Sequence, residues 1–178
     1  QVPAEPLNLD RRVDDSDLGA SLESVFATFE REPIAAASIA QVHGATLHDG
    51  TPVVVKVQRP TVDDLVHNDL KVMAWLSPFL VGRIPVASLA NPPALVEVFA
   101  RTISEELDFR VEAANMIDVA AVFADLDQRQ FVVPRPHPEL VTRRVLVMER
   151  LDGFRFDDME RYEEHGVDTH AIVRASMI

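Results

Sequence analysis

A single lysine stands in the middle of a short, valine-rich segment of the sequence. The segment runs VVVKVQ over residues 53–58, and β-branched residues at this density predict a β-strand. Side chains alternate along a strand, so Lys56 points away from the face that Val53, Val55 and Val57 share. Proteins that transfer phosphoryl groups place a lysine on such a strand, where it holds nucleotide phosphates and pairs with a glutamate on a helix. A solvated lysine on the open face of a hairpin is the alternative interpretation.

Four small side chains precede this strand, at Ala35, Ala36, Ala37 and Ser38. Small side chains let backbone N–H groups approach a phosphate closely, which is the physical basis of glycine-rich nucleotide-binding loops. Alanine keeps its Cβ and reaches positive φ less easily than glycine, so such a loop would be stiffer. Ordinary tight packing would account for the same four residues, and the sequence alone leaves both interpretations open.

Acidic residues cluster at Glu105, Glu106, Asp108 and Glu112, in a segment with helical periodicity. At about 100° per residue, Glu106 and Glu112 fall about 60° to either side of Phe109, so both border the apolar stripe that would pack on a sheet. A buried cation could meet them there. A solvated acidic face is the usual alternative, and a metal site held by these carboxylates is a third. No histidine falls among them, which argues against a di-iron type of centre.

Turn signals and apolar periodicity predict the elements that would position these groups. Asp49-Gly50 predicts a tight hairpin turn just before the strand that carries Lys56. Apolar residues at helical spacing predict a helix over 22–29 with Ser21 as its N-cap, another over 61–76, and helical structure over 94–127 in one or two segments.

The remainder of the chain predicts two further strands and two short helices. The strands are expected at 131–133 and 144–148, on either side of a proline-rich connection, and Asp152-Gly153 predicts a turn. Asp157 or Asp158 could cap one short helix, and Asp168 could cap another. This order of elements predicts an α+β fold, in which helices pack on an antiparallel sheet.

The composition limits the classes of protein to which the chain can belong. Of its 178 residues, 47% are hydrophobic, so it can bury a core, and its net charge of −12 opposes a nucleic-acid-binding face or docking on an anionic membrane. The absence of cysteine excludes disulfides and thiolate metal sites. The longest nearly apolar stretch, 72–81, is too short to span a bilayer. Because the chain begins with Gln1 and stops inside an expected helix, we expect it to be part of a longer protein.

Three segments together resemble the UbiB family of atypical kinase-like proteins, also called aarF-domain or ADCK-type kinases. They are PIAAASIAQVHGATLHDGTPVVVKVQRP at 33–60, EELDFRVEAAN at 105–115 and RRVLVMERLDG at 143–153, and they come in the family's order. The resemblance starts near residue 18, and its first segment is the most specific. It implies a protein-kinase-like N-lobe, including an αC-type helix, followed by the start of a C-lobe. We therefore expect a lead-in segment over 1–20, the N-lobe over 21–151, and the hinge exit with a truncated C-lobe over 152–178.

The resemblance also implies roles for the residues already singled out. The segment Ala35–Ser38 would be the alanine-rich loop over the phosphates of ATP. Lys56 would contact those phosphates, and Glu112 would be its partner on the αC-type helix. Glu106 and Asp108 would form the family's ExD motif.

The end of the second strand pair would contact the base of the nucleotide. In this interpretation Met148, Glu149 and Leu151 belong to the gatekeeper and hinge against which adenine docks. The implied cofactors are ATP and Mg²⁺, but the family's catalytic aspartate and metal ligands lie after the hinge, beyond Ile178, and its KxGQ motif lies before this chain. We therefore expect the chain alone to bind nucleotide weakly and to lack useful turnover, while its parent is an atypical kinase or ATPase.

The family's link to isoprenoid quinone and other lipid biosynthesis implies further partners. It implies a lipid or quinone-biosynthesis partner, and a cytoplasmic protein that is peripheral to a membrane in its full length. A non-catalytic, pseudokinase-like scaffold that binds a protein or a lipid enzyme is the competing class of function. A catalytic loop with its aspartate, encoded downstream of Ile178 in the parent gene, would distinguish the enzyme from the scaffold.

Overall fold

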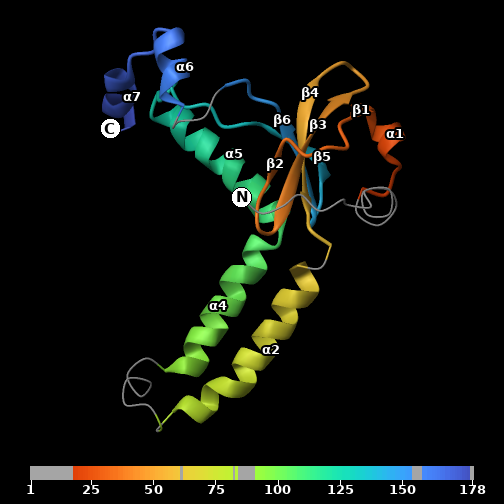
Figure 1. Cartoon of the computed structure of the whole chain (residues 1–178), viewed down its shortest axis with the longest axis vertical. Helices are drawn as coiled ribbons and strands as arrows, with labels where there is room; N and C mark the ends of the chain where they lie inside the picture. The colour runs from red at the N-terminus through yellow and green to blue at the C-terminus, as the bar shows by residue number, and fades with distance from the viewer. Residues whose placement is uncertain (1–17, 61, 82, 84–90, 154–157, 177–178) are drawn as a thin grey trace.

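The computed structural model consists of an antiparallel sheet with helices packed on it and a pair of long helices that extends away from the sheet (Figure 1). The structure describes residues 18–60, 62–81, 83, 91–153 and 158–176. The strands are β1 Phe26–Phe29, β2 Ala35–Ala36, β3 Ala40–Leu47, β4 Pro52–Gln58, β5 Pro136–Val141 and β6 Val145–Glu149. The helices are α1 Leu22–Val25, α2 Val62–Leu80, α4 Pro92–Glu106, α5 Phe109–Asp125, α6 Met159–Glu164 and α7 Thr169–Ser176.

The strand that carries Lys56 lies at the centre of the sheet. The strand order is β1-β3-β4-β6-β5, with β2 paired to β3, and every pairing is antiparallel. The predicted hairpin is present between β3 and β4, where Gly50 has a φ of +88° and Thr51 donates its N–H to the Asp49 carboxylate at 2.8 Å. Both flanks of β4 are therefore paired, and its central residues are fixed by two neighbouring strands.

The two faces of the sheet support two separate hydrophobic cores. The core on the first face is larger and consists of buried residues from α1 and four strands: Leu22, Phe26, Ala45, Val53, Val55, Val57, Val145 and Val147. The core on the second face joins the sheet to α5 through Ala40, Leu146, Phe109 and Ala113. Lys56 is paired with Leu146 across β4 and β6, so its side chain lies on the second face, as the predicted alternation requires.

The first predicted helix is wrong in its second half. Only Leu22–Val25 is helical, and Phe26–Phe29 pairs with β3 as an edge strand. The pairing is irregular between Phe26 and Thr28, and the rings of Phe26 and Phe29 lie 5.6 Å apart. A bulge of this kind lets residues three apart share a side, which imitates the spacing of a helix.

Two further boundaries also differ from prediction. The strand expected at 131–133 is absent, and the expected proline-rich connection instead contains β5, Pro136–Val141. Proline lacks the N–H that a central strand must donate, but β5 is at the edge of the sheet, where proline is tolerated. Helix α2 continues through Pro78 to Leu80. The proline removes only the backbone hydrogen bond to the Ala74 carbonyl, which accepts one from the Ser77 hydroxyl at 3.3 Å instead.

The two short helices expected near the C-terminal end are present, with aspartate caps. Asp158 and Asp168 accept hydrogen bonds from the N–H groups of Arg161 and Ala171 at the starts of α6 and α7. The turn expected at Asp152-Gly153 has no regular structure up to Gly153, and Asp157 lies outside the described residues. Most of the expected lead-in also lies outside the described residues.

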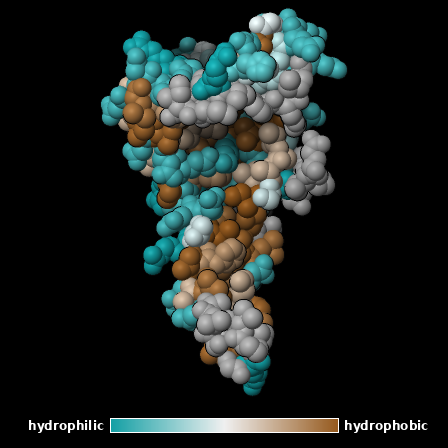
Figure 2. All heavy atoms as spheres, turned by 90° about the vertical axis from the view of Figure 1, so that its left-hand side faces the viewer, coloured by the Kyte–Doolittle hydropathy of each residue, from teal (hydrophilic) through white to brown (hydrophobic). Residues whose placement is uncertain are grey.

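Helices α2 and α4 run side by side and form an arm, defined here as residues 62–80 and 92–106 (Figure 1). At the start of α2, Asp63 pairs with two arginines of the turn between β5 and β6, Arg143 at 3.2 Å and Arg144 at 3.4 Å. Its apolar side chains are widely exposed, with Trp75 69% and Val98 64% accessible. Figure 2 shows this apolar surface as a band along the arm. No helix in the described parts of the chain is both long and apolar enough to cross a membrane.

A buried histidine on the first face makes the stability of the fold depend on pH. His43 is 1% exposed, stacks on Phe29 with ring centroids 5.3 Å apart, and its Nδ1 lies 3.0 Å from the Glu30 carbonyl oxygen. Within the described residues its Nε2 has no hydrogen-bond partner. Burial lowers the pKa of His43 below its ordinary value of 6.5, so the folded chain favours the neutral ring.

We expect the free energy of unfolding to fall as the pH drops below about 6.5, because the unfolded chain then binds a proton that the folded chain resists. Above that pH both states are neutral at this position and the contribution is complete. Urea unfolding at several pH values between about 7.5 and about 5.5 measures the slope of the free energy of unfolding against pH. His43→Asn should flatten it, whereas His170→Gln, at an exposed histidine, should not. Equal slopes for wild type and His43→Asn would contradict the prediction.

Candidate functional site

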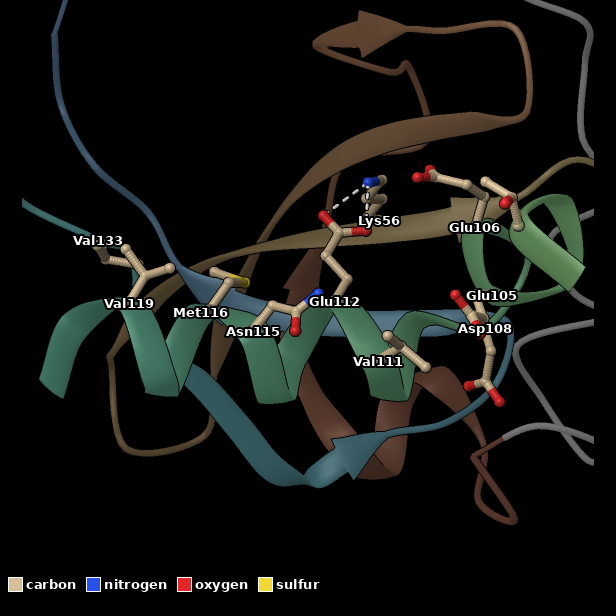
Figure 3. A pocket seen from close by; sticks show the side chains of 11 residues that line it. Lys56, Glu105, Glu106, Asp108, Val111, Glu112, Asn115, Met116, Val119 and Val133 are labelled. Carbon is tan, nitrogen blue, oxygen red and sulfur yellow. Dashed lines mark hydrogen bonds and ion pairs between the residues drawn. The ribbon is translucent and has the colours of Figure 1, made fainter. Parts of the chain in front are cut away.

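The ion pair predicted between the strand and a helix is present. The Nζ of Lys56 donates to both carboxylate oxygens of Glu112, each at 2.7 Å (Figure 3). The two residues are 56 positions apart in the sequence, and they come from the centre of the sheet and the first turn of α5. Glu112 lies in the first turn of α5, where the positive end of the helix dipole favours a carboxylate.

Phe109 positions α5 against the sheet beneath this ion pair. It begins the helix, is 1% exposed, and its N–H donates to the Arg143 carbonyl at 3.0 Å. The Lys56 nitrogen lies 4.8 Å from the centre of the Phe109 ring, which is a cation–π distance. The ammonium group is thus held by a carboxylate and an aromatic face, and its side chain remains 23% exposed.

The acidic residues lie on two helices rather than on one. Helix α4 ends at Glu106 and α5 begins at Phe109, so the angles expected for a single helix do not apply. Figure 3 shows the Glu106 carboxylate pointing toward Lys56 from α4, while Glu105 and Asp108 point away from it. The break occurs at Leu107 and Asp108 because the Asp108 side chain accepts the Arg110 N–H at 3.0 Å and caps the new helix.

Asp108 is already engaged by its neighbour Arg110. The guanidinium and the carboxylate approach to 2.6 Å. The side-chain hydrogen bond from Arg110 is the main cause that holds the pKa of Asp108 below its usual range. Asp108 is therefore an ionised cap at the α4–α5 junction, defined here as residues 106–109, and its oxygens are shared between the backbone and an arginine.

A cavity of about 510 Å³ opens beside the ion pair. Its wall contains Lys56, Glu105, Glu106, Asp108 and Glu112. It also contains residues that the sequence analysis did not single out: Thr102, Val111, Asn115, Met116, Val119 and Val133. Asn115, Met116 and Val119 follow Glu112 at three, four and seven positions, so helical periodicity counted from Glu112 would have found them. The cavity joins a charged end at Lys56 to an apolar end at Val119 and Val133 (Figure 3).

The predicted alanine-rich loop is partly a strand. Ala35 and Ala36 pair with Val42 and Gln41 as β2, and the Ala37 N–H donates to the Ala40 carbonyl at 2.9 Å, which closes a tight turn. Ala37 and Ser38 are exposed at this turn. Neither they nor β2 line the cavity that contains Lys56.

The predicted hinge residues also lie outside that cavity. Met148 packs against the core on the second face, beside Phe109 and Leu146. The Glu149 carboxylate lies 3.3 Å from the N–H of Arg135, and Leu151 is 45% exposed. The structure therefore brings Lys56, Glu106, Asp108 and Glu112 around one cavity and places the loop and hinge residues elsewhere on the lobe.

Among the described residues, no three histidine or carboxylate side chains are arranged to hold a metal ion. Glu112 is instead engaged by the Lys56 ammonium group, and Asp108 is engaged by the start of α5 and by Arg110. A metal site made by this segment alone has no support in this geometry.

A comparison with protein families identifies the chain. The family model of the ABC1 atypical kinase-like domain matches residues 1–177. The chain belongs to the ABC1 atypical kinase-like family. The resemblance to UbiB proteins is confirmed by two relatives named "Probable protein kinase UbiB": one from Shewanella piezotolerans is 36% identical over 94% of this chain, and one from Pseudomonas aeruginosa is 38% identical over 97% of it.

A solved structure supports the predicted fold class. Rv3197 from Mycobacterium tuberculosis, solved in complex with erythromycin, matches 90% of this chain with a TM-score of 0.69 and 30% sequence identity. The predicted kinase-like α+β architecture is therefore confirmed. The chain spans about a third of the length of its UbiB relatives, 30% and 32%, and 39% of the solved Rv3197 chain.

We expect the Lys56–Glu112 ion pair to stabilise the fold only modestly, because 23% of one side chain and 38% of the other remain exposed. A double-mutant cycle with Lys56→Met and Glu112→Gln, followed by urea unfolding, should give a coupling free energy of about 0.2–1 kcal/mol. The Asp127–Arg129 pair, 77% and 88% exposed, is the control and should give a coupling near zero. A coupling of several kcal/mol between Lys56 and Glu112 would contradict this prediction.

Asp108→Ala should lower the free energy of unfolding by about 1 kcal/mol, because α5 loses its N-cap. Asp108→Asn should lose less, since asparagine caps a helix about as well as aspartate. Urea unfolding of the two variants measures the difference. If asparagine were as damaging as alanine, the ion pair with Arg110 and not the cap would be the stabilising contact.

Proposed function

We propose that this chain is the ATP-binding lobe of a UbiB-type atypical kinase or ATPase. The observation that carries the proposal is the ion pair between Lys56 on the central strand and Glu112 on α5, beside a cavity. A lysine paired with a helix glutamate is the arrangement by which protein kinases hold the phosphates of ATP. Family membership supports the same assignment.

The size and chemistry of the cavity fit a nucleotide bound as its Mg²⁺ complex. A volume of about 510 Å³ lies within the range typical of small-molecule sites. Four carboxylates and one ammonium group line it, so its wall is anionic and would repel a bare triphosphate. Mg²⁺ supplies the charge that this wall lacks, and the ligands of the ion would come from parts of the full-length protein outside this chain.

Within this proposal the remaining predicted residues act at the edges of the site. Ala35, Ala36, Ala37 and Ser38 would cover the phosphates, and Met148, Glu149 and Leu151 would contact the adenine. Residues 21–151 would form the N-lobe, and 152–178 would lead into the C-lobe. We also propose that the chain alone has no useful turnover, because the catalytic aspartate of kinases belongs to the C-lobe.

The full-length protein would act in isoprenoid quinone or other lipid biosynthesis, as a cytoplasmic protein in peripheral contact with a membrane; the likeness to UbiB proteins supports this step. A non-catalytic scaffold is the second candidate. The exposed apolar side chains of the arm favour it, because an apolar surface of this kind commonly marks a protein interface. ATP turnover by the purified full-length protein would decide between the two.

In the full-length protein, Lys56→Ala should weaken the binding of ATP with Mg²⁺ by about tenfold or more, because a charged hydrogen-bond donor to the phosphates is lost. Glu112→Ala should act in the same direction by releasing the Lys56 side chain. Isothermal titration calorimetry measures both affinities. Arg129→Ala, at an arginine 88% exposed and outside the cavity, should bind as the wild type does. Unchanged affinity in both site variants would remove this cavity as the nucleotide site.

A further inference from the structure

The chain carries a second cation, Arg59, three residues after Lys56. Arg59 follows the last residue of β4 and is 8% exposed. It does not line the cavity. Burying a guanidinium group is costly unless its N–H groups are satisfied, so its contacts indicate what the residue does.

Arg59 holds the turn that connects β2 to β3. Its side-chain Nε donates to the Ala37 carbonyl at 3.1 Å, and its backbone N–H donates to the Ile39 carbonyl at 2.9 Å. The two bonds engage carbonyl groups on either side of Ser38. A third bond, from the Ala37 N–H to the Ala40 carbonyl, closes the turn itself. These hydrogen bonds hold the turn in place, because its exposed alanines make few packing contacts.

The contact to the Ala37 carbonyl also determines where the next N–H points. A trans peptide is planar, and its C=O and N–H groups point in opposite directions. Because the Ala37 oxygen is directed to Arg59, the N–H of Ser38 is directed away from the guanidinium group. A short alanine at position 37 leaves space around that N–H, which a larger side chain would restrict.

The residue before Arg59 fixes the other side of the site in a similar way. The side chain of Gln58 is buried and donates to the Leu107 carbonyl at 3.0 Å, in the α4–α5 junction between Glu106 and Asp108. Two consecutive residues at the end of the strand that carries Lys56 thus reach the loop and the acidic junction. Their contacts place both features relative to the lysine.

We propose that Arg59 is a positioning residue, which orients the Ala37–Ser38 peptide so that the Ser38 N–H donates to a phosphate of the bound nucleotide. The inference rests on the proposed function, because it assumes that ATP binds to this lobe. The phosphate contact then belongs to the backbone N–H of Ser38. The affinity for phosphates depends on the Arg59 side chain, although that side chain does not touch the nucleotide.

The test uses the full-length protein and compares two ligands, ATP with Mg²⁺ and adenosine, by isothermal titration calorimetry. Arg59→Ala should weaken ATP binding by about tenfold, as expected for one hydrogen bond to a charged group, and leave adenosine binding within about twofold. Arg59→Lys keeps a donor without the rigid guanidinium fork and should fall between wild type and alanine. Arg83→Ala, at an exposed arginine that lies over Phe79 on the arm, is the control and should bind both ligands as the wild type does.

A second variant tests the peptide itself and does not depend on whether Arg59→Ala folds. Ser38→Pro removes the N–H at this position and should weaken ATP binding more than Ser38→Ala does. Equal loss of ATP and adenosine in Arg59→Ala would show general loosening and overturn the inference, as would unchanged ATP affinity in Arg59→Ala or Ser38→Pro. Failure of the wild-type protein to bind ATP would instead overturn the proposed function.

Discussion

The packing of α5 on the sheet, where Lys56 meets Glu112, is the constraint on which the arrangement of the lobe depends. It requires the centre of β4 and the first turn of α5 to face each other. Phe109 and Ala113, on the same helix, are buried against the sheet there. Burial of a phenylalanine contributes about 1.5–3 kcal/mol, whereas a partly exposed ion pair contributes about 1 kcal/mol at most. Packing therefore sets the position of the helix, and the ion pair specifies which side chains face each other.

The central place of β4 explains how residues distant in the sequence come together. Because β3 lies on one side of β4 and β6 on the other, the residues of this strand lie within reach of the β2–β3 turn, of α5 and of Met148. The end of the strand continues this role, since Gln58 and Arg59 contact the α4–α5 junction and the alanine-rich turn. One strand thus organises the acidic and the small-residue parts of the lobe.

The sequence predicted the features that depend on local chemistry. Asp49-Gly50 marked the hairpin, alternation placed Lys56 opposite the buried valines, and the capping aspartates marked the last two helices. The sequence did not predict β1 or β5, because a bulge imitates helical spacing in the first and an edge position permits proline in the second. The division between α4 and α5 was left open for a different reason: α4 ends before Asp108 because the carboxylate of Asp108 caps the next helix. The side-chain contact of Arg59 needed the three-dimensional structure, since it reaches the Ala37 carbonyl 22 residues earlier in the chain.

Both faces of the sheet are buried, and substitutions on the two faces have different consequences. On the face of Val53, Val55 and Val57, a substitution changes how well the lobe folds but leaves the charged wall of the cavity in place. On the face of Lys56 and Leu146, a single substitution disturbs the support of α5 and the neighbouring charges together. An engineer who wishes to make this lobe more robust without altering its chemistry should therefore repack the valine face.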